Sequence, residues 1–265
     1  RAVVGDRPGV AALGAQAAVN VLCDPAAPPC WASGGQAHAD LPMRFYLGLE
    51  RRLGQRLPGT RPVAPLLTAR SSHLAQSLEA DGWFDGITLG AITATSWPQL
   101  KDYTEERYVA LAQHLARFTR CSVRLLLIGG DQPAPASPDS EDIDAQVHLR
   151  RLAGIPADHL VDVFARCDLV VGNDTGLTHV ASLSRRRDGT GPHVIGLYAR
   201  HSHSKWRTGW PHHHAVATGF SERMHQGDLC PVRDAITPTR DADLAAIPPE
   251  DLAETCLPLL PGRQP

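Results

Sequence analysis

The chain has 265 residues, of which 43% are hydrophobic and 20% are charged, and its formal net charge is −2. This composition allows a sizeable buried core and so excludes a disordered protein, while apolar runs such as Leu125–Ile128 are far too short to span a membrane. Because positive charge is not in excess, we expect no nucleic-acid partner. The length suits one large α/β domain or two modest ones, with no integral membrane segment.

Six cysteines are scattered along the chain, and no two of them form a C-x-x-C pair. This spacing fits neither a disulfide framework nor a zinc ribbon. The N-terminal residues also lack the basic and apolar segments of a secretory signal. We therefore predict reduced thiols and a cytoplasmic protein. Of the 26 basic residues, only Lys101 and Lys205 are lysines, so each lysine of this arginine-biased chain is informative.

Few segments of the first 65 residues have the apolar spacing of a helix or a strand. Their patterns indicate a strand over 17–22 and a helix over Leu41–Leu53, whose apolar residues have helical spacing. A second helix is predicted over Ser71–Ala80, because Leu74 and Leu78 lie four residues apart.

From about residue 83 onward, short apolar strands alternate with amphipathic helices. The predicted strands are Ile87–Ala91, Val123–Ile128, Leu169–Gly172 and His193–Tyr198. The predicted helices are one capped by Thr104, then Leu160–Arg166 and Thr175–Ser184. The acidic, proline-rich stretch Pro133–Asp144 is predicted to be a surface loop. This alternation predicts βαβ units and a parallel sheet.

The most informative segment is Asp168–Ser182 (DLVVGNDTGLTHVAS), in which a buried strand opens through a short turn into a helix. Ligands of parallel α/β sheets bind at the carboxyl ends of the strands, and the free N–H groups of a helix N-terminus bind a phosphate. Gly176 allows the backbone to approach such a phosphate. Thr175 and His179, four residues apart, share one helical face. The segment therefore predicts a phosphate site; the alternative is that Asp174 is a simple helix cap.

This segment resembles the D-T-G-x-x-H-x-A signature of glycosyltransferase family 9, the heptosyltransferase family. Other segments agree with the family in order and spacing. They are a lysine loop at Trp97–Tyr108, a Gly-Gly strand end at Leu125–Asp131, a strand with a tryptophan-bearing loop at Val194–Trp206, and a terminal helix start at Ala246–Leu252. The resemblance covers about residues 70–260, and D-T-G-x-x-H is its most specific part.

The resemblance implies an α/β fold of the GT-B type, with two Rossmann-like domains that have parallel sheets. The C-terminal domain of this fold holds the donor nucleotide. The candidate catalytic residues are Lys101, which would pair with the donor diphosphate, and Asp174 in the phosphate-binding turn. The donor phosphate-binding residues that the resemblance implies are Thr95, Ser96, Lys101, Asp174, Thr175, Gly176 and His179. A lysine and a helix N-terminus would stabilise the charge of the leaving diphosphate, so neither a metal nor a cofactor is expected.

The N-terminal part departs from the family. Family members carry an N-terminal domain whose first strand ends in a Gly-Asp loop, and that loop supplies the base that deprotonates the acceptor. About 80 residues precede the donor domain here, roughly half of the usual complement. We interpret residues 1–80 as a short or incomplete acceptor-side domain and 81–265 as the nucleotide-sugar donor-binding domain. Gly5-Asp6 is followed by Pro8 where the family begins a helix, so the general base is left unassigned.

Three alternatives compete with this interpretation. His201, His203 and the run His212–His214 lie close together in the sequence and could bind a metal, but a defined second ligand pair is missing. A Rossmann oxidoreductase is disfavoured because no G-x-G-x-x-G follows a predicted strand. A catalytically degenerate nucleotide-binding homologue is the strongest alternative, because the base loop is not identified.

The sequence thus predicts an inverting, metal-independent glycosyltransferase. Its donor would be an ADP-sugar or another nucleotide-sugar, with heptose as a candidate sugar. The acceptor hydroxyl could belong to a glycan, a protein or a small molecule, and the sequence leaves these alternatives open.

Overall fold

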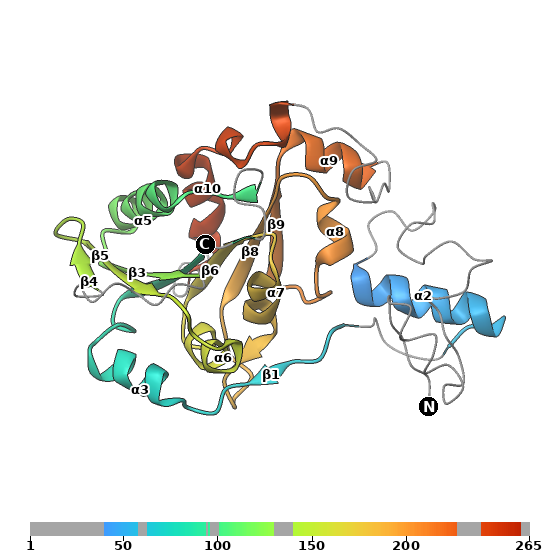
Figure 1. Cartoon of the computed structure of the whole chain (residues 1–265), viewed down its shortest axis with the longest axis horizontal. Helices are drawn as coiled ribbons and strands as arrows, with labels where there is room; N and C mark the ends of the chain where they lie inside the picture. Colours follow the sequence, from blue (N-terminus) through green and yellow to red (C-terminus); the bar gives the residue numbers. More distant parts are fainter. Residues whose placement is uncertain are drawn as a thin grey trace.

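A seven-stranded sheet organises the described part of the chain (Figure 1). The computed structural model describes residues 40–57, 63–93, 95, 101–129, 140–226 and 240–260. The strands of the sheet are β2 (Ile87–Ile92), β3 (Val123–Ile128), β4 (Ser140–Asp142), β5 (Val147–Leu152), β6 (Leu169–Asn173), β8 (His193–Tyr198) and β9 (His213–Ala217). Their order is β4-β5-β3-β2-β6-β8-β9, and every neighbouring pair is parallel except β4 with β5.

The strand order has a reversal in its middle. Without the edge strand β4, the parallel strands in chain order are β2, β3, β5, β6, β8 and β9, and their spatial order is therefore 3-2-1-4-5-6. This is the doubly wound order of dinucleotide-binding folds, in which ligands bind outside the carboxyl ends of the strands where the order reverses. In this chain the reversal lies between β2 and β6, which pair directly.

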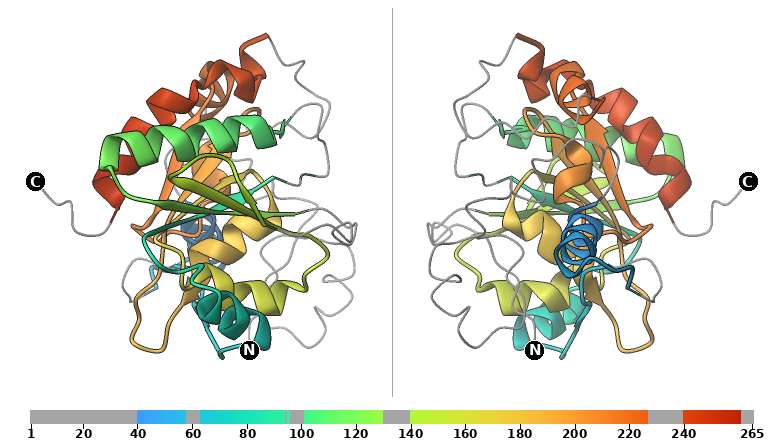
Figure 2. Two further views of the ribbon diagram at one scale, coloured as in Figure 1. Left: turned by 90° about the vertical axis from the view of Figure 1, so that its left-hand side faces the viewer. Right: turned by 90° about the vertical axis from the view of Figure 1, so that its right-hand side faces the viewer.

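Helices cover both faces of the sheet because its central strands are apolar on both sides. In β3, Leu125 and Leu127 belong to one core cluster, whereas Leu126 and Ile128 belong to the other. The helices of the first face are α5 (Glu105–Thr119) and α10 (Pro249–Cys256), and those of the second are α3 (His73–Ala80), α6 (Ala157–Phe164) and α7 (Gly176–Leu183). Figure 2 shows α5 and α10 on one side of the sheet and α3 and α6 on the other.

Most predicted elements are confirmed. The helix over Leu41–Leu53 is α2, with the predicted bounds, and β3 and β8 also have theirs. β2 and β6 each differ from the predictions by one residue at one end, and α7 is one residue shorter at both ends. Thr104 is the N-cap residue of α5, although its side chain makes no capping hydrogen bond. The strand expected over 17–22 lies outside the described residues.

The sequence patterns do not predict β4, β5 or β9. The predicted loop Pro133–Asp144 is wrong at its C-terminal end, where Ser140–Asp142 forms β4, because these residues pair with β5 and tertiary pairing overrides local polarity. β5 carries Arg150 and Arg151, which find ion-pair partners in Asp81 and in Glu105. Charges that are paired across elements in this way break the apolar pattern by which a strand is recognised.

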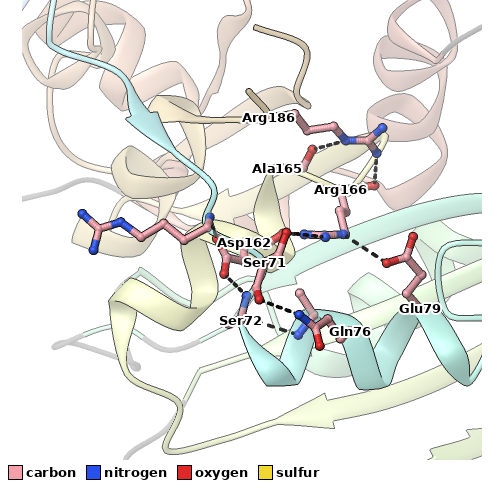
Figure 3. Close-up of polar contacts among 10 residues, drawn as sticks. Ser71, Ser72, Gln76, Glu79, Asp162, Ala165, Arg166 and Arg186 are labelled. Atoms are coloured by element: carbon pink, nitrogen blue, oxygen red, sulfur yellow. Dashed lines mark hydrogen bonds and ion pairs between the residues drawn. The ribbon is translucent and has the colours of Figure 1, made fainter. Parts of the chain in front are cut away.

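Residues 67–80 pair with and pack against elements that surround the seven-stranded sheet. β1 (Leu67–Thr68) pairs with β7 (Ser184–Arg185), and α3 packs on α6. The buried carboxylate of Asp162 accepts hydrogen bonds from the backbone N–H groups of Arg70, at 2.5 Å, and Ser72 (Figure 3). Burial would raise the pKa of Asp162, but these hydrogen bonds hold it below its usual value. The expected domain boundary after residue 80 stays a prediction, and α3 lies before it.

Two further helices, α8 (His203–Trp206) and α9 (Gly219–Gln226), lie beyond the carboxyl ends of the last two strands. α8 follows β8, and α9 follows β9 (Figure 1). α2 contacts α8, and nearby the Asp40 carboxylate, buried to 3% exposure, pairs with Arg207 at 3.1 Å. Among the helices described, none combines the length and the apolar character that crossing a membrane requires.

Candidate functional site

The structure brings Lys101 and Asp174 together, although 73 positions separate them in the sequence. Lys101 lies between β2 and α5, and Asp174 directly follows β6, so both extend from the two strands at which the sheet order reverses. The Lys101 Nζ atom lies 3.3 Å from Asp174 Oδ2, and the two side chains are 14% and 10% exposed. An ammonium group has three N–H donors, so this ion pair holds Lys101 in place while leaving donors for a ligand.

The turn after β6 presents a helix N-terminus at the same edge. α7 begins at Gly176, and its N-cap residue, Thr175, makes no side-chain capping bond. Gly176 is exposed, and a Cβ atom added there would have no atom of the described residues within 4 Å. The described protein therefore does not itself require a glycine at this position. A glycine leaves the first-turn N–H groups of α7 open to an approaching ligand, which is compatible with the predicted phosphate site.

Two polar side chains, one at the N-cap of α7 and one within the helix, have unused hydrogen-bonding capacity beside this turn. Thr175 Oγ1 and His179 Nδ1 are buried and have no hydrogen-bond partner within the described part of the chain. His179 Nε2 lies 3.9 Å from Asp174 Oδ1. Burial, and then the charge of Lys101, lower the pKa of His179, against the opposing effect of Asp174. A neutral imidazole can donate one hydrogen bond and accept another, so His179 can support a bound anion by donating to it.

A buried amide connects the lysine segment to the turn. Asn173, at the end of β6, accepts hydrogen bonds at Oδ1 from the backbone N–H of Tyr103 at 3.0 Å and from the hydroxyl of Tyr108 at 3.2 Å. Its Nδ2 donates to the carbonyl of Thr93, just after β2, at 3.0 Å. All these bonds cross from β6 to the chain around β2 and α5. Asn173 therefore sets the position of Lys101 relative to Asp174.

Of the two hydroxyl residues predicted to bind phosphate, the structure describes Thr95 only. Thr95 donates a hydrogen bond of 2.8 Å from its Oγ1 to the carboxylate of Asp102, beside Lys101. Burial raises the pKa of Asp102, and the bond from Thr95 opposes that shift. Ser96 lies outside the described residues, so its role in phosphate binding stays a prediction, as does that of Thr95.

Sequence reasoning missed Asn173, Asp102 and the two tyrosines. The only available signal was an amide at the end of a buried apolar strand, which must find hydrogen-bond partners but does not reveal which ones. The histidines are distributed differently from the sequence-based alternative. His213 lies against His179, with ring centroids 5.7 Å apart, and His214 contacts His193. Among the described residues, His203 instead meets side chains of α9.

The chain resembles known proteins in its sequence and in its fold. The family model for glycosyltransferase family 9 (heptosyltransferase) matches residues 48–232 of the chain. No curated protein matches the chain. ADP-heptose lipopolysaccharide heptosyltransferase II of E. coli has a similar structure at a TM-score of 0.50 and 19% identity, covering 77% of this chain and 55% of that protein. A family 9 glycosyltransferase of Veillonella parvula gives a TM-score of 0.51 at 17% identity, covering 80% of this chain and 57% of that one.

The chain thus spans a little more than half the length of these structures. At such low identity the likeness shows the fold, which is the mostly parallel α/β fold of the GT-B heptosyltransferases. The family match covers more than half of the chain and includes both Lys101 and the turn after β6. The chain belongs to glycosyltransferase family 9.

Proposed function

We propose that this chain takes part in moving a sugar, with heptose as the first candidate, from an ADP-linked or other nucleotide-linked donor to an acceptor hydroxyl. One observation carries the proposal. The Lys101–Asp174 pair and the N-terminus of α7 meet where the sheet order reverses, and that edge is where this fold binds nucleotides. Family membership and the ADP-heptose named for the E. coli structure support the choice of donor.

The proposed chemistry is a single in-line displacement. The acceptor oxygen attacks the anomeric carbon as the bond from that carbon to the phosphate oxygen breaks, which inverts the anomeric centre. The bonding electrons leave with the nucleoside diphosphate, and the acceptor proton passes to a base that we do not assign to a described residue. Lys101 and the first-turn N–H groups of α7 stabilise the negative charge that develops on the leaving group, and neutral His179 donates a further hydrogen bond.

The proposal also covers metal dependence, the acceptor and the compartment. The charge is supplied by Lys101 and by the helix, so transfer needs no metal at the phosphates. The acceptor is a glycan, a protein or a small molecule. The protein works in the cytoplasm, where nucleotide-sugars are available as substrates.

A thermal-shift series with ADP, UDP, GDP and NAD⁺ tests the donor site. A ligand that binds only the folded state at about 100 times its dissociation constant stabilises it by about 2.7 kcal/mol, or about 5–11 °C for a domain of this size. We expect ADP to give a shift of this kind. The proposal is wrong if no nucleoside diphosphate raises the melting temperature.

A second measurement separates transfer from binding alone. With an ADP-sugar and a mixture of candidate acceptors, an active enzyme releases ADP in proportion to the glycosylated product. A catalytically degenerate homologue would show the thermal shift with ADP but would release none.

A further inference from the structure

Three side chains from two helices converge near the end of β8. They are His203 of α8 and Glu222 and His225 of α9, and one potential ligand atom from each lies within 4.8 Å of the other two. His203 Nε2 lies 3.2 Å from Glu222 Oε2, and the rings of His203 and His225 have centroids 4.0 Å apart. The geometry places two imidazoles and one carboxylate around a common point.

The fold explains why these residues meet. α8 and α9 follow β8 and β9, which are parallel neighbours, so both helices start at the same edge of the sheet and lie beside one another (Figure 1). Glu222 and His225 are three residues apart on α9, a spacing that puts both side chains on one helical face. That face points to His203 at the start of α8.

The burial of the cluster suits a ligand that enters from one side. His225 is buried, with 7% of the residue exposed, and the side chain of His203 is 14% exposed. The carboxylate side chain of Glu222 is 45% exposed, so solvent reaches the cluster there. Gln226 donates a hydrogen bond of 3.1 Å to Glu222 Oε1, which orients the carboxylate and leaves Oε2 toward the histidines. Such outer contacts commonly position the ligands of a metal.

We propose that His203, Glu222 and His225 bind one divalent transition-metal ion, of which Zn²⁺ and Fe²⁺ are the best matches. Both ions have protein sites built from two histidines and one carboxylate, with water in the remaining positions, whereas Mg²⁺ prefers oxygen ligands. Zinc bonds of about 2.0–2.2 Å put tetrahedral ligands about 3.4 Å apart. The ligand atoms of the three residues lie within 4.8 Å of one another, and His203 Nε2 and Glu222 Oε2 are already 3.2 Å apart.

The expected effect of the ion is to join α8 to α9. A metal that binds the folded state and not the unfolded one stabilises the fold by mass action. The site shares no residue with the phosphate site, and its proposal does not depend on the proposed transfer reaction.

Calorimetric titration of the metal-stripped full chain with Zn²⁺ tests the site, using Glu222→Gln and His225→Gln as disrupting variants. Glu254→Gln and His159→Gln change the same residue types at exposed positions of α10 and α6 and serve as matched controls. We expect one equivalent to bind to the wild type and to both controls. Each disrupting variant should bind at least about tenfold more weakly, because it removes one of three ligands.

Two further readouts protect the test against misfolding and against cysteine binding. Zn²⁺ should raise the melting temperature of the wild type and not that of Glu222→Gln. This variant should fold normally, because the side chain of Glu222 is partly exposed. Co²⁺ should give the visible bands of a nitrogen and oxygen site without a thiolate charge-transfer band. The proposal is overturned if Glu222→Gln and His225→Gln bind Zn²⁺ like the controls, or if the Co²⁺ spectrum shows thiolate ligands.

Discussion

The phosphate turn after β6 and the histidine cluster after β8 and β9 lie at the same edge of one sheet, yet they differ in how visible they are in the sequence. Asp174, Thr175, Gly176 and His179 form one contiguous motif, because a single turn and a single helix carry them. The cluster draws on two helices that follow different strands. A local motif therefore reveals the first site, whereas only the pairing of β8 with β9 reveals the second.

The largest expected effect tests the visible site. Lys101→Ala removes the ammonium group that faces the diphosphate, and hydrogen bonds to charged groups contribute about 1.5–3 kcal/mol. ADP affinity should fall by about 10–100-fold in calorimetry. With an acceptor identified, kcat/KM should fall on the order of 10²-fold, because the interaction strengthens as charge develops on the leaving group.

Two companion variants make this result specific. Lys101→Arg should recover part of the affinity, since a planar guanidinium does not replace a compact ammonium. Arg187→Ala removes a positive charge from an exposed turn and should leave ADP binding unchanged. If Lys101→Ala binds ADP as the wild type does, the assignment of the lysine loop fails, and so does the alignment with the family around it.

The same contrast between local and distant signals explains how much of the fold was predictable. β2, β3, β6 and β8 are buried central strands, so each is a short apolar run that can be read directly. β4 is exposed along its length, and two of the last three residues of β5 are arginines, so neither has such a run. β9 begins with two histidines and lies at the sheet edge. Edge strands depend on their neighbours for their conformation, and a single sequence does not show those neighbours.

The site was predictable to a similar extent. Helical spacing predicts that Thr175 and His179 share one face. In the structure Thr175 is the extended N-cap residue just before α7, and a polar atom of each side chain has no partner among the described residues. That Lys101 and Asp174 belong to one site was an expectation from the family resemblance, whereas their ion pair was not predicted. The hydrogen bonds of Asn173 to Tyr103 and Tyr108 could not be predicted, because many residues could satisfy a buried amide.

The next largest expected effect concerns the hydrogen bonds of Asn173. Asn173→Ala leaves the Tyr103 N–H and the Thr93 carbonyl without this partner, whereas the Tyr108 hydroxyl keeps the carbonyl of Ile92. Buried unsatisfied groups cost about 1–3 kcal/mol each, so we expect a total loss of about 3 kcal/mol and a melting temperature lower by about 6–12 °C. Gln76→Ala removes an exposed amide that makes one hydrogen bond to Ser71, and should change stability by less than about 0.5 kcal/mol. Equal melting temperatures for the two variants would contradict a role of Asn173 in holding the site together.

The smallest expected effect asks whether the two regions are independent. EDTA should leave the affinity for ADP within about twofold, because Lys101 and the N-terminus of α7 supply the positive charge without a metal. The same treatment should lower the melting temperature if an ion joins α8 to α9. Tyr198 is the residue through which this separation could fail: its ring centroid lies 6.3 Å from that of His203, and its pKa is raised by burial first and also by the charge of Asp174. Loss of ADP binding in EDTA, with recovery on addition of Zn²⁺, would mean that the histidine cluster acts on the phosphate turn across Tyr198, and the two sites would then have to be treated as one.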